Sequence, residues 1–398
     1  MSSTSTITPL RVALVAHSLV RAGAEKQFVY MAQAFKRLGV GLKVFYLGTG
    51  DHYDSVLQAS GIPMERIPCI TRAWHRLWKL SVAMRRFQPD LVLASQFGDV
   101  MQAGLAGRAN GAMVISGIRS NGFWEMSHHG RRSWLMSRLP HAFLANSHLA
   151  RANLESLGFD SNRIAVLPNA IDLAEFDRQS EASFCLDARP DQVVVVAVGR
   201  LTAEKRFDRF IGALALLPPT APPVLGVLVG ADYGKQAELE AQAKRLGLGR
   251  DRLMVFGDCK NVPALLKRAH MLALCSDWEG FPNVILEAMA AGLPVVTTPA
   301  GDAPRIVRAE ETGFVVGFDD SQGLSERIRQ LAESTELRGR LGREARRVVE
   351  RDYSLALLDR HLISALRLLA RARGRKLLLP MLDRLDPRAS LDPQPVTS

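Results

Sequence analysis

Two glutamates, Glu279 and Glu287, stand on either side of a glycine- and proline-containing loop in the segment WEGFPNVILEAMAAG. A pair of carboxylates in this setting suits acid–base catalysis, metal binding or ligand binding, or else the two are ordinary helix charges. The apolar run MLALCS (271–276) before the loop is typical of a buried strand. We therefore expect Glu279 in a loop at the carboxyl end of a strand, where α/β sheets bind their ligands.

The residues after this loop predict a helix. Asn283 is expected to cap a helix over 284–291, which Gly292 and Pro294 then end. A helix amino terminus offers N–H groups and the positive end of the helix dipole to an anion. Glu287 lies one turn inside the helix, so its carboxylate suits paired hydroxyl groups such as those of a ribose.

A second motif, VGRLTAEKRFD (198–208), places two cations between an apolar run and a helical pattern. Gly199 ends the expected strand, and Arg200 and Lys205 follow it. Arginine grips phosphate oxygens in a bidentate manner and lysine adds a point charge, so the pair suits a diphosphate. A solvated pair at a helix start is the alternative. The motif is not a Walker loop, and no Gly-x-Gly-x-x-Gly follows the first expected strand, which argues against a simple dehydrogenase.

The elements that must position these motifs form two series of short apolar runs with helical patterns between them. Such runs need cover on both faces, which favours parallel α/β sheets. The expected strands lie at 11–17, 42–48, 90–95, 112–118, 141–147 and 163–172 in the first series, and at 193–199, 223–230, 253–257, 271–276 and 294–298 in the second. With two doubly wound halves, the cleft between them is the expected site.

A polar stretch at 177–191 is interpreted as a linker between the two halves. We expect an N-terminal domain over 1–176, a C-terminal domain over 190–355, and a basic helix over 356–376 that packs back toward the first domain. The residues at 387–398 are rich in proline, aspartate and serine and are expected to be a disordered tail. Ser147 is expected to cap the helix that follows it.

Composition narrows the class of protein. The 398 residues carry a formal net charge of +11, which favours anionic partners or simply raises solubility. The four cysteines form no Cys-x-x-Cys pair, which favours a reducing compartment and argues against a zinc site or a disulfide framework. We expect no signal peptide and no membrane-spanning helix. No nucleic-acid partner is expected, because charge alone would support one and no recognition motif is present.

Taken together, the motifs resemble one family. The segment EGFPNVILEAMAAGLPVV resembles the hallmark of the retaining glycosyltransferases of family 4, also called group 1, and VGRLTAEK resembles their diphosphate-binding loop. LPNAID (167–172) is similar to the segment that ends their first domain, and RAGAEKQ (21–27) to their N-terminal loop. The resemblance runs in family order over residues 10–350. It implies the α/β GT-B fold, with two facing Rossmann-like domains and an interdomain cleft.

The resemblance also implies roles for individual residues. Arg200 and Lys205 would bind the donor diphosphate. Glu279 would contact hydroxyl groups of the transferred sugar, and Glu287 would hold the ribose. The remaining donor-binding residues are glycines or lie in the loop before the helix: Gly23, Gly199, Gly280, Phe281, Pro282 and Asn283.

Two places depart from the family pattern. Where the family often has a histidine near the reacting sugar, this chain has Arg119, a poor proton acceptor that could instead bind an acidic acceptor or a phosphate. We place Arg119 in the catalytic set with Glu279 and the two cations of the diphosphate loop. Where the family often has two glycines and a glutamate, the sequence AGDAPRIV has Asp302 and Arg305. These changes leave two questions open: which donor sugar is used, and whether the chain is a catalytically inactive homologue.

The resemblance implies a retaining, hexosyltransferase-type enzyme that needs neither metal nor cofactor and uses a UDP-sugar or, second, a GDP-sugar as co-substrate. Both motif glutamates would lie on the donor side, so we do not expect them to act as nucleophile and acid. The leaving diphosphate would accept the acceptor's proton while Arg200 and Lys205 neutralise its charge. The expected task is synthesis of bacterial surface polysaccharide or glycolipid, lipopolysaccharide included, in the cytoplasm at the inner face of the plasma membrane. The alternatives are a catalytically silent sugar- or nucleotide-binding homologue, or another GT-B enzyme such as a sugar-nucleotide epimerase.

Aromatic and basic residues in the first half predict a surface role. Trp74 and Trp78 stand one helical turn apart among arginines, which suits either core packing or contact with an anionic membrane. The stretch NGFWEMSHHGRRSW (121–134) is also basic and aromatic. Since the first domain of the family receives the acceptor, we expect this stretch to bind a lipid-linked or polysaccharide acceptor. The pair His128–His129 lacks a third ligand at a recognisable spacing, so no metal site is expected.

Overall fold

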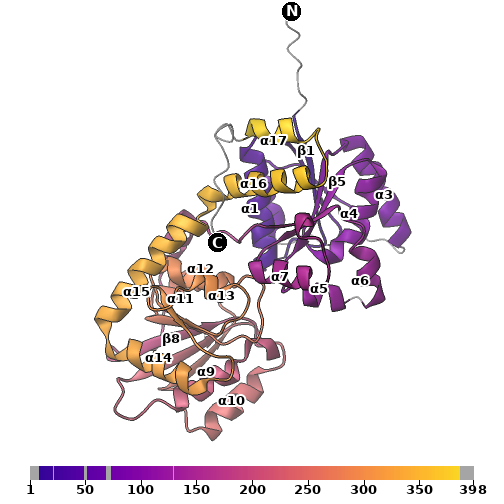
Figure 1. The fold of residues 1–398 in the computed structure, drawn as a ribbon. Helices are drawn as coiled ribbons and strands as arrows, with labels where there is room; N and C mark the ends of the chain where they lie inside the picture. Colours follow the sequence, from indigo (N-terminus) through magenta and orange to yellow (C-terminus); the bar gives the residue numbers. More distant parts are fainter. Residues whose placement is uncertain (1–8, 21, 49–51, 69–72, 129, 386–398) are drawn as a thin grey trace, which may run out of the picture. The chain divides into compact units, whose positions relative to one another are not determined.

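The computed structural model describes residues 9–20, 22–48, 52–68, 73–128 and 130–385. The chain forms two compact units, each with its own sheet (Figure 1). Unit 1 comprises residues 1–169 and 356–398, and unit 2 comprises residues 170–355. The chain therefore leaves unit 1, builds unit 2 and returns to complete unit 1.

Unit 1 is built on a seven-stranded sheet with the order β3-β2-β1-β4-β5-β6-β7, in which every neighbouring pair is parallel. Its strands are β1 (Arg11–Ala16), β2 (Gly41–Tyr46), β3 (Met64–Arg66), β4 (Leu91–Ala94), β5 (Met113–Ile118), β6 (Ala142–Ala145) and β7 (Ile164–Val166). Since all seven carboxyl ends lie along one edge, the loops after the strands gather there.

The helices of unit 1 connect and cover these strands. They are α1 (Gly23–Arg37), α2 (His52–Ala59), α3 (Ala73–Phe87), α4 (Val100–Ala109), α5 (Phe123–His128), α6 (Arg131–Met136), α7 (His148–Ser156), α16 (Leu358–Ala372) and α17 (Leu379–Leu385). As predicted, Ser147 caps α7, since its hydroxyl accepts a hydrogen bond of 3.1 Å from the backbone N–H of Ala150. The returning helix α16 packs on α1, where Arg37 pairs with Asp359 at 2.6 Å (Figure 1).

Unit 2 has a six-stranded sheet of the order β10-β9-β8-β11-β12-β13, again with every neighbouring pair parallel. Its strands are β8 (Val193–Val198), β9 (Val224–Val229), β10 (Leu253–Gly257), β11 (Met271–Leu274), β12 (Val295–Thr297) and β13 (Gly313–Val315). Its helices are α8 (Leu173–Ser180), α9 (Phe207–Ala215), α10 (Gln236–Arg245), α11 (Val262–Leu266), α12 (Asn283–Ala290), α13 (Ala303–Ile306), α14 (Ser321–Glu333) and α15 (Thr335–Val348).

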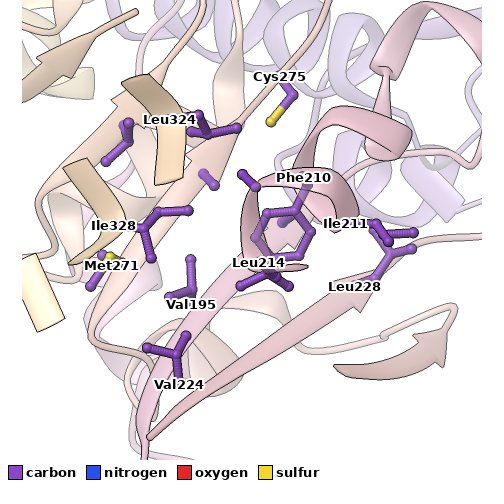
Figure 2. Packing of buried hydrophobic residues seen from close by; sticks show 14 of the residues in the cluster. Val195, Phe210, Ile211, Leu214, Val224, Leu228, Met271, Cys275, Leu324 and Ile328 are labelled. Carbon is purple, nitrogen blue, oxygen red and sulfur yellow. The ribbon is translucent and has the colours of Figure 1, made fainter. Parts of the chain in front are cut away.

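The central strand β8 is buried on both faces, which explains its continuous apolar sequence. Val195 and Ala197 point into one core, which includes Phe210 of α9 and Ile328 of α14 (Figure 2). The alternating residues of the strand, such as Val196, pack on the other face in a second core. Both faces of the strand are covered, so a continuous apolar run of five valines and one alanine replaces the alternating pattern of a half-exposed strand.

The structure confirms the eleven strands expected from the sequence and adds β3 and β13, which are only three residues long. The interpretation of 177–191 as a linker is wrong at its start, because α8 runs to Ser180 and contacts α11 of unit 2. Asp177 pairs with Arg346 at 2.7 Å, and Phe184 packs on the core. The unit boundary consequently lies at residues 169–170. The tail expected at 387–398 lies outside the described residues.

Candidate functional site

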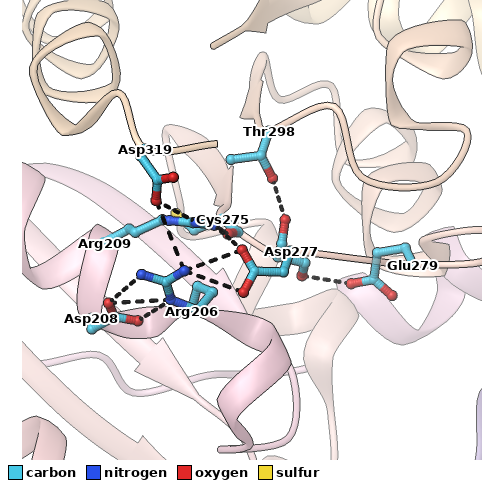
Figure 3. Close-up of polar contacts among 9 residues, drawn as sticks. Arg206, Asp208, Arg209, Cys275, Asp277, Glu279, Thr298 and Asp319 are labelled. Atoms are coloured by element: carbon cyan, nitrogen blue, oxygen red, sulfur yellow. Dashed lines mark hydrogen bonds and ion pairs between the residues drawn. The ribbon is translucent and has the colours of Figure 1, made fainter. Parts of the chain in front are cut away.

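The segment from β11 to α12 carries Glu279 and Glu287. Glu279 lies in the loop after β11, and its Oε1 accepts a hydrogen bond of 2.7 Å from the Ser276 hydroxyl. The Thr298 hydroxyl donates to the Ser276 carbonyl at 2.7 Å, which ties this loop to the end of β12 (Figure 3). The Glu279 carboxylate is therefore held in one orientation by its own loop.

The helix after this loop begins one residue earlier than predicted. Asn283 is the first residue of α12, and Pro282 occupies the capping position, so the expected side-chain cap by Asn283 is wrong. Gly292 follows the last turn with φ of 74°, as the predicted helix end requires. Glu287 is partly exposed, one turn inside α12.

The diphosphate-loop motif reaches Glu279. The Lys205 Nζ lies 2.6 Å from Glu279 Oε1, and the two side chains are only 17% and 13% exposed. The lysine stem runs past Gly199, where a side chain would come within 3.5 Å of it. Two segments 74 residues apart in the chain thus meet at the carboxyl ends of β8 and β11.

Arg200 is placed differently from its partner cation. Its guanidinium is 61% exposed, lies 3.8 Å from Glu204 and stands 5.6 Å from the centre of the Tyr233 ring. The side chain reaches outward from the same loop that sends Lys205 inward. A long cation held loosely beside a ring can turn toward an incoming anion.

The rest of the loop before α12 contributes mainly backbone. Phe281 is 7% exposed and packs edge-on against Tyr353, with the ring centres 5.8 Å apart. The carbonyl of Gly280 accepts a hydrogen bond of 3.3 Å from the N–H of Asp302. Asp302 is buried and Arg305 is exposed, so of the two residues that depart from the family pattern only Arg305 reaches solvent.

A second layer of charges beneath this site was not predicted (Figure 3). Arg209 of α9, only 6% exposed, pairs with Asp277 at 2.6 Å and with Asp319 at 2.7 Å. Arg206 contacts Asp208 at 3.0 Å and Asp277 at 3.2 Å. Asp277 follows β11, so these pairs hold the loop with Lys205 against the loop with Glu279. The sequence signal that could have revealed these pairs is Arg209 itself, an arginine within the otherwise mostly apolar helix FDRFIGALA.

In unit 1, Arg119 lies directly after β5. Its backbone N–H donates to Glu125 at 3.0 Å and its Nε donates to the carbonyl of Ser95 at 3.2 Å. Burial lowers the pKa of Arg119 to about 10, while the carboxylate of Glu25 acts in the opposite direction. The guanidinium is therefore charged at neutral pH and is fixed at the carboxyl edge of the sheet.

Two acids accompany Arg119 at this edge. Glu25 of α1 accepts a hydrogen bond of 3.2 Å from Gln96, and burial raises its pKa. Asp99 is buried, and burial raises its pKa to about 7. Gly23 is the exposed first residue of α1. Gly23 and Arg119 thus belong to unit 1, whereas the other predicted site residues belong to unit 2.

The described residues contain no group of three histidine, cysteine, aspartate or glutamate side chains that could hold a metal ion. In the described part of the chain, no helix is both long and apolar enough to cross a membrane.

Comparison with known proteins identifies the family. Residues 179–348 match the family described as glycosyl transferases group 1, and residues 21–175 match the one described as glycosyltransferase family 4. The chain is a group 1, family 4 glycosyltransferase. The matched segments contain both motifs of unit 2 and Arg119 of unit 1.

Individual relatives are distant. The lipopolysaccharide core biosynthesis mannosyltransferase LpsB of Rhizobium meliloti is 29% identical over 209 residues, 50% of this chain and 57% of LpsB. The putative colanic acid biosynthesis glycosyltransferase WcaL of Escherichia coli is 25% identical over 65% of this chain and 64% of its own length. The chain of this glycosyltransferase thus spans little more than half the length of these curated relatives.

A solved structure shows the fold over nearly the whole chain. The Anabaena protein Alr3699/HepE in complex with UDP aligns with a TM-score of 0.77 at 21% identity, covering 90% of this chain and 99% of that one. At this identity the likeness shows the fold alone. It confirms that this family 4 glycosyltransferase has the GT-B fold, with two Rossmann-like units.

Proposed function

We propose that this glycosyltransferase moves a sugar, with retention of configuration, from a nucleotide-sugar to a glycolipid or polysaccharide acceptor in bacterial surface glycan synthesis. The observation that carries the proposal is the buried contact between Lys205 and Glu279, 2.6 Å apart, beside the amino end of α12. This arrangement offers a cation and backbone N–H groups to a diphosphate and a carboxylate to sugar hydroxyls. The surface-glycan roles of LpsB and WcaL support the choice of task.

The donor is proposed to be a UDP-sugar first and a GDP-sugar second. Structures of Alr3699/HepE with UDP and with UDP-glucose support the first choice. Arg200 and Lys205 would hold the diphosphate, Glu279 the sugar and Glu287 the ribose. In the free protein Lys205 is paired with Glu279, so donor binding would replace that pair with one contact to phosphate and one to sugar.

The proposed chemistry places the negative charge of the leaving diphosphate against Lys205 and Arg200, and this diphosphate takes the proton of the acceptor hydroxyl. The protein then contributes positioning and fixed positive charge, which are effective without rearrangement during the reaction. Transfer is expected to continue at an unchanged rate in EDTA. Loss of turnover in EDTA and its return with a divalent ion would overturn this account.

The test of the proposed function is transfer of sugar from UDP-sugars and GDP-sugars to a glycolipid extract. Glu279→Ala and Lys205→Ala are each expected to lower turnover by roughly 100-fold or more, the effect of losing one preorganised charge contact. Arg347→Ala serves as the control, because Arg347 is 71% exposed on α15. Turnover at the parent rate in both site variants would refute the site.

A catalytically silent, nucleotide-binding homologue is the second candidate. It is favoured by Arg119, whose Nε is already bonded to Ser95 and whose pKa precludes proton transfer near neutrality. Calorimetric titration with UDP separates the two candidates. Binding of UDP together with absence of transfer and hydrolysis across the donor panel would establish the silent protein.

We further propose that a face of unit 1 contacts an anionic membrane. Trp74 and Trp78 of α3 are 64% and 58% exposed, so the core-packing interpretation of this stripe is wrong. Trp134 of α6 is 62% exposed and lies among the exposed cations Arg131 and Arg132. Tryptophan at the headgroup level and arginine beside anionic lipid are the usual components of such contacts.

Vesicle flotation tests this contact. The parent protein is expected to float with phosphatidylglycerol vesicles and to stay behind with phosphatidylcholine vesicles. Trp74→Ala/Trp78→Ala should lower the floated fraction several-fold, whereas replacement of the exposed Tyr233 of unit 2 by alanine should leave it unchanged. Equal flotation of all three proteins would contradict the assignment.

A further inference from the structure

Unit 1 contains a cavity of about 590 Å³ that none of the proposed roles uses. One wall is formed where β4 and β5 begin, by residues that include Asp90, Asn110 and Met113, and another wall by the segment 374–378 after α16. Its volume lies within the range of small-molecule sites, which is about 300–1,000 Å³.

The cavity lies at the opposite edge of the sheet from the site residues of unit 1. Met113, the first residue of β5, lines the cavity, whereas Arg119 follows the last residue of the same strand. A six-residue strand separates its two ends by roughly 17 Å at about 3.3 Å per residue. The cavity is therefore separate from the carboxyl edge of the sheet, where Arg119 lies.

Cations converge on this cavity from two segments of the chain. Arg85 comes from the end of α3, and Arg375 and Lys376 come from the segment after α16. Within the described residues, none of these three side chains donates a hydrogen bond to an oxygen or forms an ion pair. The one acid of the lining, Asp90, already accepts a hydrogen bond of 2.8 Å from the backbone N–H of Arg11.

Arg375 contacts His141, but this contact gives the arginine no hydrogen-bond acceptor. The backbone N–H of Val114 donates to His141 Nδ1 at 2.9 Å, so a neutral ring carries its proton on Nε2. Arg375 Nη2 lies 2.7 Å from that Nε2, and two donors then face each other. His141 therefore supplies no acceptor, and the arginine gains a partner by turning toward an anion in the cavity.

The positive charges of the neighbouring arginines also affect the pKa of His141. Burial and the charges of Arg108, Arg375 and Arg373 lower the pKa of His141 to about 4. The ring is thus neutral at physiological pH, and the positive charge around it comes from the arginines. Three arginines around one neutral histidine indicate a persistent positive potential at this edge.

We propose that this cavity binds a phosphate group through Arg85, Arg375 and Lys376. A phosphate has enough oxygen atoms to contact all three cations at once, and its charge matches their excess over the single engaged carboxylate. The Asn110 amide already donates to the carbonyls of Ser81 and Ala106, so the three cations are the groups that face the phosphate. Leu377 and Leu378 form an apolar border. A phosphate that contacts both walls also fastens the segment after α16 to unit 1, so its binding stabilises that unit.

The experiment is equilibrium dialysis of labelled orthophosphate against the full chain, with UDP at saturation to fill the proposed donor site. We expect saturable binding of one phosphate per chain. Arg85→Ala and Lys376→Ala should each weaken it about 10-fold, the effect of one lost charge-assisted hydrogen bond of about 1.4 kcal/mol. Both side chains are exposed, and circular dichroism will verify that the variants fold.

Arg86→Ala is the matched control, because Arg86 is the exposed neighbour of Arg85 on α3 and does not line the cavity. Lys205→Ala separates this inference from the proposed function: it should remove turnover and leave phosphate binding intact. Equal affinity in the parent, Arg85→Ala and Arg86→Ala proteins would rule out a free phosphate in the cavity, whatever the result of the transfer assay.

A second arm of the experiment distinguishes a free phosphate from a lipid headgroup. Flotation with phosphatidylglycerol vesicles is measured in the Trp74→Ala/Trp78→Ala background, with and without Arg85→Ala. Residual flotation that Arg85→Ala removes assigns the cavity to a lipid phosphate, and binding of orthophosphate alone assigns it to a soluble phosphate. Absence of an Arg85-dependent signal in both arms would refute the phosphate site.

Discussion

At the scale of single residues, Arg209 of unit 2 supports the candidate site without contacting a ligand itself. Arg209 lies beneath the site and holds Asp277 and Asp319, while its Nη1 also donates to the carbonyl of Cys275 at 3.1 Å. Asp277 and Asp319 are 38% and 84% exposed, so water compensates them in part when the cation is lost, whereas the Cys275 carbonyl loses a charged donor. The loop that carries Glu279 therefore depends on this cation.

Arg209→Met keeps the length of the side chain and removes its charge. We expect the free energy of unfolding to fall by about 1–2 kcal/mol, and affinity for UDP to fall with it. Urea unfolding and calorimetric titration measure the two effects. Arg347→Met, an exposed arginine of the same unit, should change the unfolding energy by less than about 0.5 kcal/mol. Similar losses in both variants would contradict the role assigned to Arg209.

The buried carboxyl group of Asp99 leads to a prediction about how the stability of the protein depends on pH. Burial raises its pKa to about 7 from the ordinary value of 3.8, so the folded protein holds this proton more tightly than the unfolded chain does. Between about pH 4 and pH 7 the folded state binds more protons, and stability therefore falls as pH rises through this window. Asp99→Asn removes this contribution. It should raise the unfolding energy at pH 8 by a few kcal/mol relative to the parent, and far less at pH 4.

Urea unfolding at the two pH values measures the difference. Asp54→Asn in α2 of the same unit provides a comparison for the loss of one carboxylate. If the parent and Asp99→Asn proteins differ equally at pH 4 and pH 8, the buried proton is not the cause.

At the scale of elements, the site depends on how tightly two loops approach each other. Gly301 lies between β12 and α13 with φ of +61°, and a side chain there would come within 2.5 Å of the Gly280 carbonyl and 2.9 Å of that of Glu279. Gly247 has a similar φ of +71° but nothing within 4 Å. The two glycines share the same backbone requirement and differ in what surrounds them.

Gly247→Ala should therefore cost about 1 kcal/mol of stability, from backbone strain alone, and leave turnover unchanged. Gly301→Ala should cost more, and should lower turnover roughly 10- to 100-fold because it displaces the backbone that carries Glu279. Thermal unfolding and the sugar-transfer assay measure both. Equal turnover in the two variants would show that the loop tolerates the displacement.

Much of the element level was predictable from the sequence, and the failures have physical causes. Buried strands such as β8 are continuous apolar runs, which are easily recognised, whereas β3 and β13 are too short to show a pattern. The stretch at 177–191 is polar in sequence, yet Phe184 and Asp177 fasten it to unit 2. A single aromatic ring and a distant arginine leave no local signal.

The candidate site was predictable to the extent that local motifs carried it. The segments with Lys205 and Glu279 were both singled out, but their 2.6 Å contact depends on the strand order of unit 2. The pairs of Arg209 have no motif, since Asp277 and Asp319 lie 68 and 110 residues away in sequence and only the fold brings them together. The cavity with Arg85 and Arg375 was unpredictable for the same reason.

At the scale of the whole molecule, unit 1 is assembled from both ends of the chain. α16 buries a row of apolar side chains in this unit, and Arg367 of the same helix pairs with Asp383 of α17 at 2.9 Å. The buried residues of the row include Leu362, Ile363, Leu366 and Leu369. Unit 2 is continuous and contains its complete sheet within residues 170–355.

A chain that stops after residue 355 should lose unit 1 selectively. Four buried leucine or isoleucine side chains contribute roughly 6–12 kcal/mol together, comparable to the whole stability of a domain. Hydrogen exchange should show β1 and β2 unprotected while β8 and β9 keep their protection. A chain that stops after residue 385 is the control and should retain both. Protected β1 amides in the shorter chain would contradict this dependence.

The return of the chain to unit 1 also sets an order of events during synthesis. Translation releases about 5–20 residues per second, and residues 356–385 leave the ribosome only after all of unit 2. Unit 2 can therefore complete its folding first, while the sheet of unit 1 waits many seconds with the surface meant for α16 uncovered. In the cell, the half that is synthesised first is the half that is finished last, and its exposed apolar surface is where a chaperone would bind.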